Sequence, residues 1–357
     1  MDYTLIVKLT NNCNLNCSYC YHRRDESRNI SLSLSRDNLE LMIAQFMRHN
    51  EKKAQFIWHG GEPLLVGIDT FRFIVRKQRE YNQKGLAVYN SVQTNGTLLD
   101  EEYMRFFRDN HFSIGISIDG PFDMHTAERK TTKSEYAAIL KAIDALSRRG
   151  ARFGTLCVLG KQHIRQEQRL FDLLVEHGIT HIGFLPCIVP TANGVDEALT
   201  LLPEEYGRMM INLFEIWINS GVKHMSIRNF DECIRFFRGR MAQNCTSLNE
   251  CDQYLTITPD GGIYLCDNFS ANEEHKAGEL ITGFDGLETT PAMVWLKDAM
   301  TRYPPGCEAC PFFGGCYGGC KYQRWVRDRS MQGRQYHCQA TKMLYAHIGK
   351  YISRGEG

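Results

Sequence analysis

Apolar and polar positions follow a repeating order over the first 225 residues, in which a short β-rich run precedes a longer amphipathic run. The expected strands are 3–8, 54–58, 87–93, 113–118, 152–158 and 181–185. The expected helices lie near 35–49, 69–83, 100–109, 134–148, 163–177 and 203–219. Six β-then-α units in succession predict a parallel sheet with right-handed crossovers. Because a closed barrel has eight units, we expect an α/β fold with an open or partial (β/α)6 barrel.

Several of the expected helices have recognisable starts. Ser35, Asp69 and Asp100 stand where an N-cap residue is expected, since their side chains can accept a hydrogen bond from the first turn. Pro203 suits the first turn of the last helix in this part of the chain.

The turns that follow the expected strands carry the residues best suited to bind a cofactor or to take part in catalysis. In chain order they hold Cys13, Cys17 and Cys20 after the first strand, HGGEP (59–63) after the second, TNG (94–96) after the third and DGP (119–121) after the fourth. The carboxyl ends of parallel strands meet at one edge of the sheet, where α/β enzymes place their sites. The sequence therefore predicts one functional site at this edge.

Beyond residue 225 the periodicity weakens, and glycine, cysteine and aromatic residues become more frequent. The stretch GCEACPFFGGCYGGCKYQ (306–323) is too rich in glycine and cysteine for an ordinary core, so we expect it to fold around metal. We divide the chain into a barrel (1–225), a bridging region (226–244), a cysteine-rich domain (245–340) and a C-terminal helix with its tail (341–357).

Bulk composition excludes several classes of partner. The chain has 357 residues with 42 basic and 41 acidic side chains, which gives a formal net charge of +1 and no global field for nucleic acid or a membrane surface. No stretch is apolar for long enough to span a membrane, and the start MDYTLIVKLT lacks the basic-then-apolar order of a signal peptide. We therefore expect a cytoplasmic protein with no nucleic-acid and no membrane partner.

The first three cysteines, Cys13, Cys17 and Cys20, have the spacing C-x3-C-x2-C. In a reducing compartment, a chain with 14 cysteines favours metal or catalytic chemistry over disulfides. A four-iron cluster normally has four thiolate ligands, so three ligands leave one iron open to a substrate. The residues between the cysteines offer no good fourth ligand. The alternative is a zinc site or a disulfide that uses a cysteine from elsewhere.

This triplet resembles the hallmark C-x3-C-x-aromatic-C of the radical S-adenosylmethionine (SAM) enzymes, with Tyr19 as the aromatic residue. The resemblance implies a 4Fe–4S cluster held by the three cysteines, with SAM chelated to the open iron. In that family, one-electron reduction cleaves SAM to a 5′-deoxyadenosyl radical, which abstracts hydrogen from the substrate. The cofactor supplies the difficult chemistry, while the protein binds, orients and shields it.

Further residues fit the same resemblance. Gly60, Gly61, Glu62 and Pro63 match the family motif GGEP, whose backbone binds the amino group of SAM. Glycine permits a close approach of backbone to ligand, although GGEP by itself is typical of a turn.

The resemblance also implies three candidate SAM contacts at or after the third and fourth strands. Ser117 is a candidate ribose contact and Asn95 a candidate pocket residue, although both could equally be polar groups that satisfy the backbone at strand ends. Arg129 is a candidate for the SAM carboxylate, and its alternative is an arginine on the protein surface.

The C-terminal cysteines resemble the SPASM pattern, an extension that carries auxiliary clusters in a subset of radical SAM enzymes. By that resemblance, the ligands of two further four-iron clusters are Cys245, Cys251, Cys266 and Cys320 for the first, and Cys307, Cys310, Cys316 and Cys338 for the second. Spacing alone cannot assign this pairing. Two structural zinc sites are the alternative, because C-x2-C pairs are common in zinc ribbons.

The remaining cysteines, Cys157, Cys187 and Cys233, sit in apolar sequence, so we predict buried packing rather than ligation. A basic stretch lies between the last two cluster cysteines, with Lys321, Arg324, Arg327, Arg329 and Arg334. These cations could tune a cluster or meet an acidic peptide. We favour a solvated helix face.

Asp267 directly follows Cys266, and here the chain resembles the anaerobic sulfatase-maturing enzymes over nearly its whole length. In them, an aspartate at this place takes a proton from the substrate while a cysteine or serine is oxidised to formylglycine. A neighbouring anionic cluster should raise the pKa of the carboxyl, which suits a general base. The alternative is a turn aspartate.

One motif departs from those enzymes, which usually read QGGEPTL where this chain has HGGEPLL (59–65). WHGGEPLL looks more like the SPASM maturases of ribosomally made peptides (RiPPs), which cross-link or otherwise oxidise a precursor. Such maturases often carry an N-terminal leader-binding domain, for which a first strand at residue 3 leaves no room.

We favour a RiPP precursor maturase, with sulfatase maturation as the alternative. The resemblance implies a peptide or protein substrate and an external electron donor, either a flavodoxin or a ferredoxin. A non-catalytic iron–sulfur electron carrier is a third hypothesis, which predicts a damaged triplet or a damaged GGEP motif. Neither motif is damaged.

Overall fold

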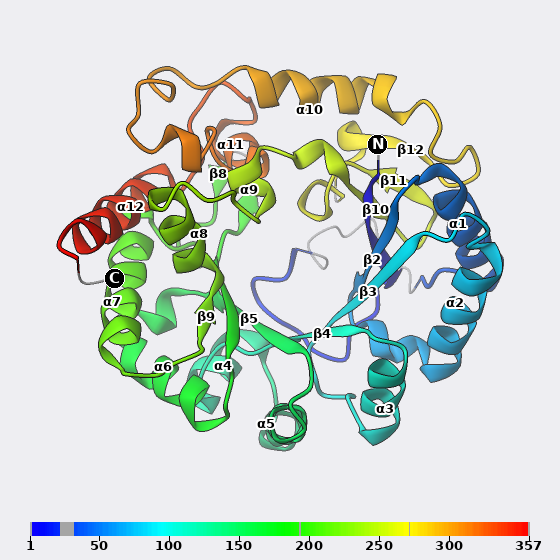
Figure 1. Cartoon of the computed structure of the whole chain (residues 1–357), viewed down its shortest axis with the longest axis horizontal. Helices are drawn as coiled ribbons and strands as arrows, with labels where there is room; N and C mark the ends of the chain where they lie inside the picture. The colour runs from blue at the N-terminus through cyan, green and yellow to red at the C-terminus, as the bar shows by residue number, and fades with distance from the viewer. Residues whose placement is uncertain (1, 22–31, 193, 271, 356–357) are drawn as a thin grey trace.

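A ten-stranded sheet runs through the protein and curls so that helices cover its outer face (Figure 1). The computed structural model describes residues 2–21, 32–192, 194–270 and 272–355. The strand order is β12-β11-β10-β1-β2-β3-β4-β5-β6-β9. Strands β1 to β6 pair in sequence order and all are parallel. The predicted α/β fold with a partial barrel is confirmed.

The barrel strands lie where the periodicity predicted them. They are β1 Thr4–Thr10, β2 Lys53–Gly60, β3 Ala87–Thr94, β4 Ser113–Ser117, β5 Phe153–Leu159 and β6 His181–Pro186. Burial alternates along β2, where Ala54, Phe56 and Trp58 are buried and the residues between them are half-buried. Because strand side chains point alternately to the two faces, the buried set packs under the helices and the other set faces the inside of the barrel.

The helices of this half are α1 Arg36–His49, α2 Ile68–Tyr81, α3 Glu101–Asp109, α4 Phe122–Arg129, α5 Lys133–Arg148, α6 Glu167–Glu176 and α7 Pro203–Asn219. Ser35 and Asp100 are N-caps, as predicted, since their side chains accept hydrogen bonds from the backbone N–H groups of Asn38 and Tyr103. The prediction for Asp69 was wrong. Gly67, with a φ of 81°, turns the chain out of a short 3-10 helix at Pro63–Val66, so α2 begins one residue before Asp69.

Two further helix boundaries differ from the sequence prediction. A 3-10 turn at Lys161–His163 precedes α6, which therefore starts at Glu167 rather than at 163. Helix α4 was not predicted, because its eight residues make only about two turns and show little periodicity. This short helix nevertheless carries residues that contact the cysteine loop.

The cysteine-rich half extends the barrel sheet. Its elements are β9 Ser226–Ile227, α8 Arg228–Phe237, α9 Cys245–Leu248, β10 Tyr254–Ile257, β11 Gly262–Tyr264, β12 Lys276–Glu279, α10 Pro291–Thr301, α11 Lys321–Asp328 and α12 Cys338–Ser353. Strand β10 pairs in parallel with β1, from Thr4 opposite Tyr254 to Val7 opposite Ile257. The first strand is therefore flanked by β2 on one side and by the C-terminal half on the other.

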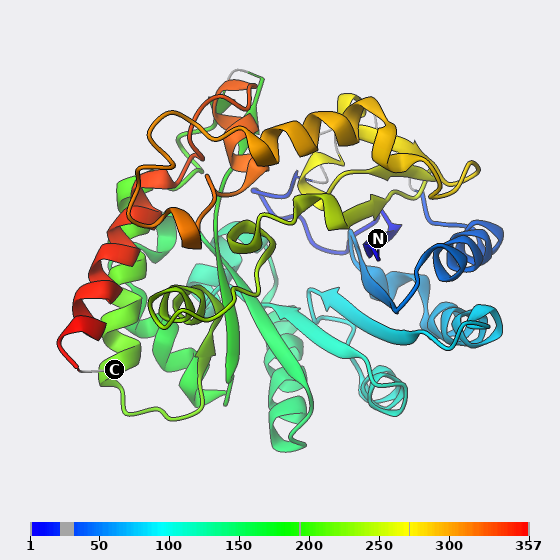
Figure 2. The same cartoon turned by 45° about the horizontal axis from the view of Figure 1, so that its top comes forward.

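A two-stranded antiparallel hairpin, β7 Pro190–Thr191 and β8 Gly194–Val195, lies outside the main sheet. The terminal helix α12 packs along α7 and α8, and Figure 2 shows it beside α7. The contact with α7 is close, because a Cβ at Gly207 would come within 2.8 Å of the sulfur of Met343. In the part of the chain that the structure describes, no helix has the length and apolar character needed to cross a membrane.

Candidate active site

The loop after β1 brings the first three cysteines together. All three side chains are half-buried. Burial raises the pKa of Cys17 to about 11, and the nearby thiols of Cys20 and Cys13 contribute to this rise. Burial also raises the pKa of Cys13, with a further contribution from Cys20. The three thiols therefore lie close enough for each to act on another.

Two N–H groups point at the sulfur of Cys13. The backbone N–H of Leu15 lies 3.4 Å from the sulfur, and the Asn95 Nδ2 lies 3.8 Å from it. Hydrogen bonds of this kind favour a thiolate and tune the potential of a bound cluster. Asn95 also donates to the Oδ1 of Asn14 at 2.9 Å, which ties the end of β3 to the cysteine loop. The surroundings of these thiols thus fit an iron–sulfur cluster.

The GGEP turn packs directly under the cysteine loop. The backbone N–H of Gly61 donates to the carbonyl of Thr10 at 2.8 Å, and that of Glu62 donates to the carbonyl of Asn12 at 2.7 Å. A Cβ at Gly61 would lie 2.1 Å from the Asn12 carbonyl oxygen, and one at Gly60 would lie 2.3 Å from that of Thr10. The glycines therefore permit a close approach of this turn to the loop that carries the cysteines.

The carboxylate of Glu62 is buried and holds two strand ends together. It accepts hydrogen bonds from the backbone N–H of Leu64 at 3.0 Å, from the hydroxyl of Thr94 at 2.7 Å and from the backbone N–H of Asn95 at 2.8 Å. Burial raises the pKa of Glu62, and these three donors oppose the rise. The side chain thus joins the end of β2 to the end of β3, behind the cysteine loop.

Ser117 ends β4 on the inner face of the barrel. Its hydroxyl accepts a hydrogen bond from the Nε2 of Gln93 at 3.0 Å. A hydroxyl keeps its own proton to donate when it accepts in this way.

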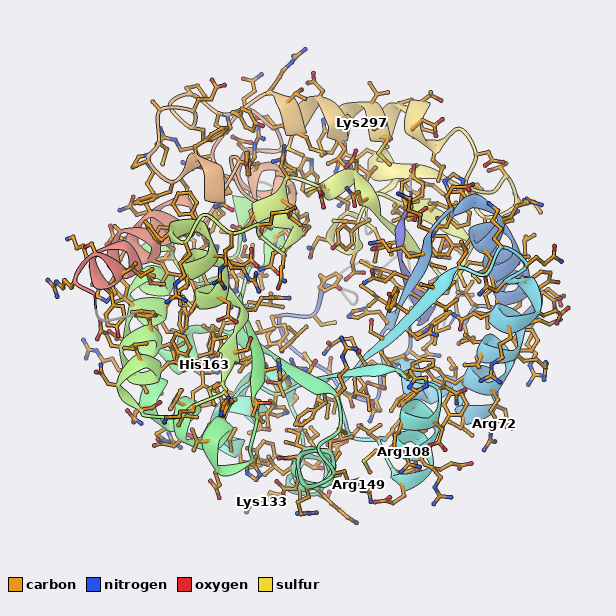
Figure 3. All side chains as sticks on the ribbon, viewed as in Figure 1. Arg72, Arg108, Lys133, Arg149, His163 and Lys297 are labelled. Carbon is orange, nitrogen blue, oxygen red and sulfur yellow. The ribbon has the colours of Figure 1, made fainter. Side chains whose placement is uncertain are left out.

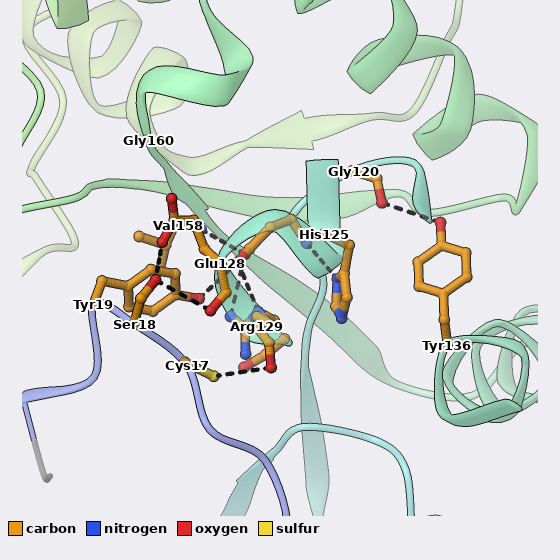
Figure 4. Close-up of polar contacts among 12 residues, drawn as sticks. Cys17, Ser18, Tyr19, Gly120, His125, Glu128, Arg129, Tyr136, Val158 and Gly160 are labelled. Carbon is orange, nitrogen blue, oxygen red and sulfur yellow. Dashed lines mark hydrogen bonds and ion pairs between the residues drawn. The ribbon is translucent and has the colours of Figure 1, made fainter. Parts of the chain in front are cut away.

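A buried ion pair beneath the cysteine loop was missed by the sequence analysis (Figure 4). The guanidinium of Arg129 donates to both carboxylate oxygens of Asp119, at 2.7 and 3.1 Å. The hydroxyl of Tyr19 donates to the same carboxylate at 2.6 Å, and the backbone N–H of Val158 donates at 2.9 Å. Burial alone would raise the pKa of Asp119, but Arg129 and its other partners hold it below the ordinary value.

The C-terminal end of helix α4, which carries Arg129, also binds the cysteine loop through its backbone. The N–H of Ser18 donates to the carbonyl of Glu128 at 2.8 Å, and the sulfur of Cys17 lies 3.9 Å from the carbonyl of Arg129. The aromatic residue of the cysteine motif and the candidate arginine are therefore parts of one clamp. The signal in the sequence was DGP (119–121), whose aspartate follows β4 as the glycine turns follow the earlier strands.

We expect Asp119→Ala to lower the free energy of unfolding by about 3–5 kcal/mol, because Arg129 would stay buried without its partner. Urea unfolding under anaerobic conditions measures this loss. Asp123→Ala is the matched control, since it breaks an exposed pair in which Asp123 meets Arg169 at 2.9 Å. An exposed pair contributes about 0–1 kcal/mol, so equal losses in the two variants would contradict the prediction.

The structure brings together Cys245, Cys251, Cys266 and Cys320. Burial raises the pKa of Cys245 to about 11 and that of Cys251 to about 12, and Cys320 contributes to both. Burial likewise raises the pKa of Cys266, with contributions from Cys320 and Cys251. These four thiols are the set that the resemblance groups around the first auxiliary cluster.

The remaining set gathers around one pocket, which is lined by Cys307, Cys310, Cys316 and Cys338 together with Arg334 and Lys342. Burial raises the pKa of Cys316 to about 12, and the three other thiols of the set contribute to this rise. Among the described residues, no three His, Cys, Asp or Glu side chains meet closely enough to hold a single metal ion. Each cysteine of a four-iron cluster binds its own iron, so such a set surrounds a space rather than a point.

Two members of the basic stretch do not belong to the solvated helix face that we favoured. Lys321 and Arg324 are each only 1% exposed. Lys321 donates to the carbonyls of Tyr317 and Gly319 at 3.1 and 3.2 Å, and Arg324 donates to that of Ala299 at 2.8 Å. These backbone acceptors offset part of the cost of burying the two cations, and burial still lowers the pKa of both side chains.

Two other members of the basic stretch agree with the expected solvated face. Arg327 and Arg334 are exposed, as a solvated face requires.

The three cysteines outside the cluster sets were predicted to pack in the core. Cys157, Cys187 and Cys233 are buried, as predicted.

Asp267 lies between the two halves of the protein, one residue after Cys266. Its carboxylate forms an ion pair with Lys8, with the Nζ 3.0 Å from Oδ1, and also accepts a hydrogen bond from the hydroxyl of Tyr21. Lys8 favours the ionised carboxylate, which opposes the effect of a neighbouring anionic cluster. His59 lies on the neighbouring strand in register with Lys8, and burial lowers its pKa, so its imidazole is neutral at pH 7.

Comparison with known proteins places this geometry in a class. Residues 7–174 match the family model described as the Radical SAM superfamily. This part of the chain is a radical SAM domain, as the cysteine triplet predicted. A radical SAM domain implies a 4Fe–4S cluster and SAM, and the thiols with their N–H donors fit that cluster.

Two relatives extend the likeness to the whole chain. A cysteine-type anaerobic sulfatase-maturating enzyme of Clostridium perfringens (strain 13 / Type A) is 29% identical over 351 residues, which cover 96% of this chain and 94% of that protein. A serine-type enzyme of Bacteroides thetaiotaomicron is 25% identical over 374 residues, which cover 98% and 90%.

Solved structures agree with these relatives. The structure of anSMEcpe with bound AdoMet (SAM) superposes with a TM-score of 0.89 and 26% identity, and covers 99% of this chain and 94% of that one. Native anSMEcpe with bound AdoMet and a Kp18Cys peptide gives a TM-score of 0.88 at 26% identity, with 99% and 98% covered. Streptococcus suis SuiB bound to S-adenosylmethionine shares the fold, with a TM-score of 0.66 at 16% identity and with 95% and 78% covered.

Proposed function

We propose that this protein oxidises a cysteine or serine side chain of a polypeptide to an aldehyde, the reaction of the anaerobic sulfatase-maturing enzymes. The observation that carries the proposal is the place of Asp267. Its carboxylate is held by Lys8 on β1 and by Tyr21 just after Cys20, while its own backbone adjoins Cys266. A carboxylate that could accept a proton thus lies close to both the triplet and the first auxiliary set.

The proposed cofactors are SAM and three 4Fe–4S clusters. The triplet would bind the catalytic cluster, and the two sets of four cysteines would bind the auxiliary clusters, which gives about twelve irons per chain. When bound, the reduced catalytic cluster and SAM would supply a radical that removes a hydrogen atom from a substrate carbon. An auxiliary cluster would accept the second electron of the oxidation, and for a cysteine substrate water would then replace the sulfur, which leaves as hydrosulfide. We propose a flavodoxin or a ferredoxin as the external electron donor.

The side chains of the protein would position and deprotonate the substrate. We propose that Gly60, Gly61 and Glu62 hold the loop against which SAM binds, and that Asn95 and Ser117 line its pocket. Asp267 would accept the proton of the substrate thiol or hydroxyl, and Lys8 would keep that carboxylate ionised beforehand. Arg129 is engaged by Asp119, so we propose that it orders the cysteine loop in addition to its predicted contact with SAM.

Oxidative maturation of a RiPP precursor is the second candidate. His59 favours it, because this residue departs from the glutamine that is usual in the sulfatase-maturing enzymes. The full-length relatives favour sulfatase maturation.

Mass spectrometry of a reacted peptide tests the proposal. The reconstituted enzyme is incubated anaerobically with SAM, dithionite and a synthetic peptide that contains one cysteine from a cysteine-type sulfatase. Formylglycine replaces sulfur with oxygen and removes two hydrogen atoms, whereas a cross-link removes only two hydrogen atoms. Aldehyde formation supports the proposal, and 5′-deoxyadenosine without any change in the peptide would contradict it.

A further inference from the structure

Arg228 starts helix α8 and lies against the inner face of the sheet. A Cβ at Gly183 on β6 would come within 2.9 Å of the Nη2 of Arg228 and 3.0 Å of its Cζ. The absence of a side chain at residue 183 therefore makes room for the guanidinium. The next residue, Asn229, fixes this arrangement, because its side-chain amide accepts from the N–H of Phe184 at 2.9 Å and donates to the carbonyl at 3.0 Å.

The register of the sheet shows which face Arg228 occupies. Ser117 on β4 pairs with Leu156 on β5, and Leu156 pairs with Gly183 on β6. The neighbours of Leu156 in β5, Thr155 and Cys157, are buried toward the helices, so the row of Ser117, Leu156 and Gly183 faces inward. Two strand spacings separate Ser117 from Gly183, about 10 Å. The guanidinium therefore lies in the same row as the proposed SAM contact.

Arg228 also lies near the first auxiliary set. Burial raises the pKa of Cys245 and of Tyr254, and in both cases the positive charge of Arg228 opposes the rise. Arg228 thus lies near both the proposed SAM site and the thiols proposed for the first auxiliary cluster.

Arg228 differs from the other cations inside the barrel because it has no ionic partner there. Lys8 pairs with Asp267 and Arg129 pairs with Asp119. Labelled cations of the outer helices, such as Arg72 and Arg149, lie at the rim of the molecule (Figure 3), where each pairs with a glutamate. Arg228 is exposed, and within the described residues it makes no hydrogen bond or ion pair. Its guanidinium offers a fork of donors that matches a carboxylate in two-point contact.

We propose that Arg228 binds the carboxylate of an acidic side chain in the polypeptide substrate and so sets which peptides the enzyme accepts. The inference rests on the proposed function in one respect, namely that the substrate is a polypeptide. It adds a specificity contact that does not take part in the oxidation. A charge-assisted pair of this kind should favour glutamate over glutamine by at least about tenfold in affinity.

Peptide binding tests the inference separately from catalysis. The probes are fluorescent peptides with one cysteine, an amidated C-terminus and a single glutamate placed in turn at each of the four positions on either side of the cysteine. Each is paired with the glutamine peptide. Anisotropy is measured anaerobically with the reconstituted enzyme and SAM. At one position or more, the glutamate peptide should bind at least about tenfold more tightly.

Variants assign the preference to Arg228. R228Q should abolish it, R228K should keep part of it because the charge remains without the fork, and R238Q should keep all of it. Arg238 is an exposed arginine at the other end of α8 and is the matched control. The inference is overturned if no position shows a preference for glutamate, or if the preference survives in R228Q.

Two further readouts separate other roles of Arg228. A weaker affinity of R228Q for SAM, or a changed auxiliary-cluster spectrum, with the glutamate preference intact would also overturn the inference. Mass spectrometry of the bound peptides reports on the proposed function alone. Peptides that bind with the expected charge preference but are never oxidised would refute the proposed oxidation and leave the assignment of Arg228 supported.

Discussion

Cys17→Ala is expected to form no detectable 5′-deoxyadenosine when the reconstituted enzyme is given SAM and dithionite. Cys17 is the middle member of the triplet, and the thiols of Cys20 and Cys13 lie close enough to raise its pKa, so its loss removes one of three ligands. Two thiolates would leave two irons without protein ligands, and a four-iron cluster requires the third. Chromatography of the nucleoside products measures the effect.

The matched control is Cys187→Ala, which removes one of the buried cysteines outside the three sets. It should retain SAM cleavage and lose only the stability expected for a small apolar truncation, about 1 kcal/mol. Iron analysis adds a second measurement, since the auxiliary sets are distant in sequence and should keep their metal in Cys17→Ala. Sustained SAM cleavage by that variant would refute the assignment of the triplet.

Much of the fold followed from periodicity because each barrel unit is built from local signals. The strands have one face against helices and one face inward, and the helix starts at Ser35 and Asp100 carry side chains that cap them. The cysteine-rich half lacked such signals. Strand β10 has only four residues, and its place beside β1 depends on a pairing across some 250 positions of sequence, which no local pattern records.

The candidate site likewise has features that the sequence predicted and features that it did not. Cysteine spacing predicted which thiols to consider, and the structure brings the members of each set close together. The ion pair of Asp119 with Arg129 could not be predicted, because the turn after β4 and the end of α4 meet only in the folded chain. Burial of Lys321 and Arg324 was missed for a related reason. Backbone carbonyls accept their hydrogen bonds, and these acceptors leave no mark in the sequence.

Asp267→Asn is expected to leave SAM cleavage within a few-fold of the original enzyme and to lower product formation by about 10²–10⁴-fold. Asparagine has the same shape and can still accept a hydrogen bond from Tyr21, so binding should change little. It cannot hold the proton that the substrate thiol or hydroxyl must release. Parallel measurement of 5′-deoxyadenosine and of oxidised peptide separates the two effects.

Lys8→Met tests whether Asp267 acts as a base or only as half of an ion pair. If the carboxylate serves as a base, Lys8→Met leaves it in place without its cation, and product formation should fall by less than in Asp267→Asn. The double variant should then be no slower than Asp267→Asn alone, since Lys8 acts through a carboxylate that is already absent. Asp298→Asn, in an exposed ion pair on α10, is the matched control and should not change either product. Equal losses of SAM cleavage and of oxidised peptide in Asp267→Asn would mean that the aspartate supports the site structurally. A base that acts only in the deprotonation of the substrate should not slow the earlier cleavage of SAM.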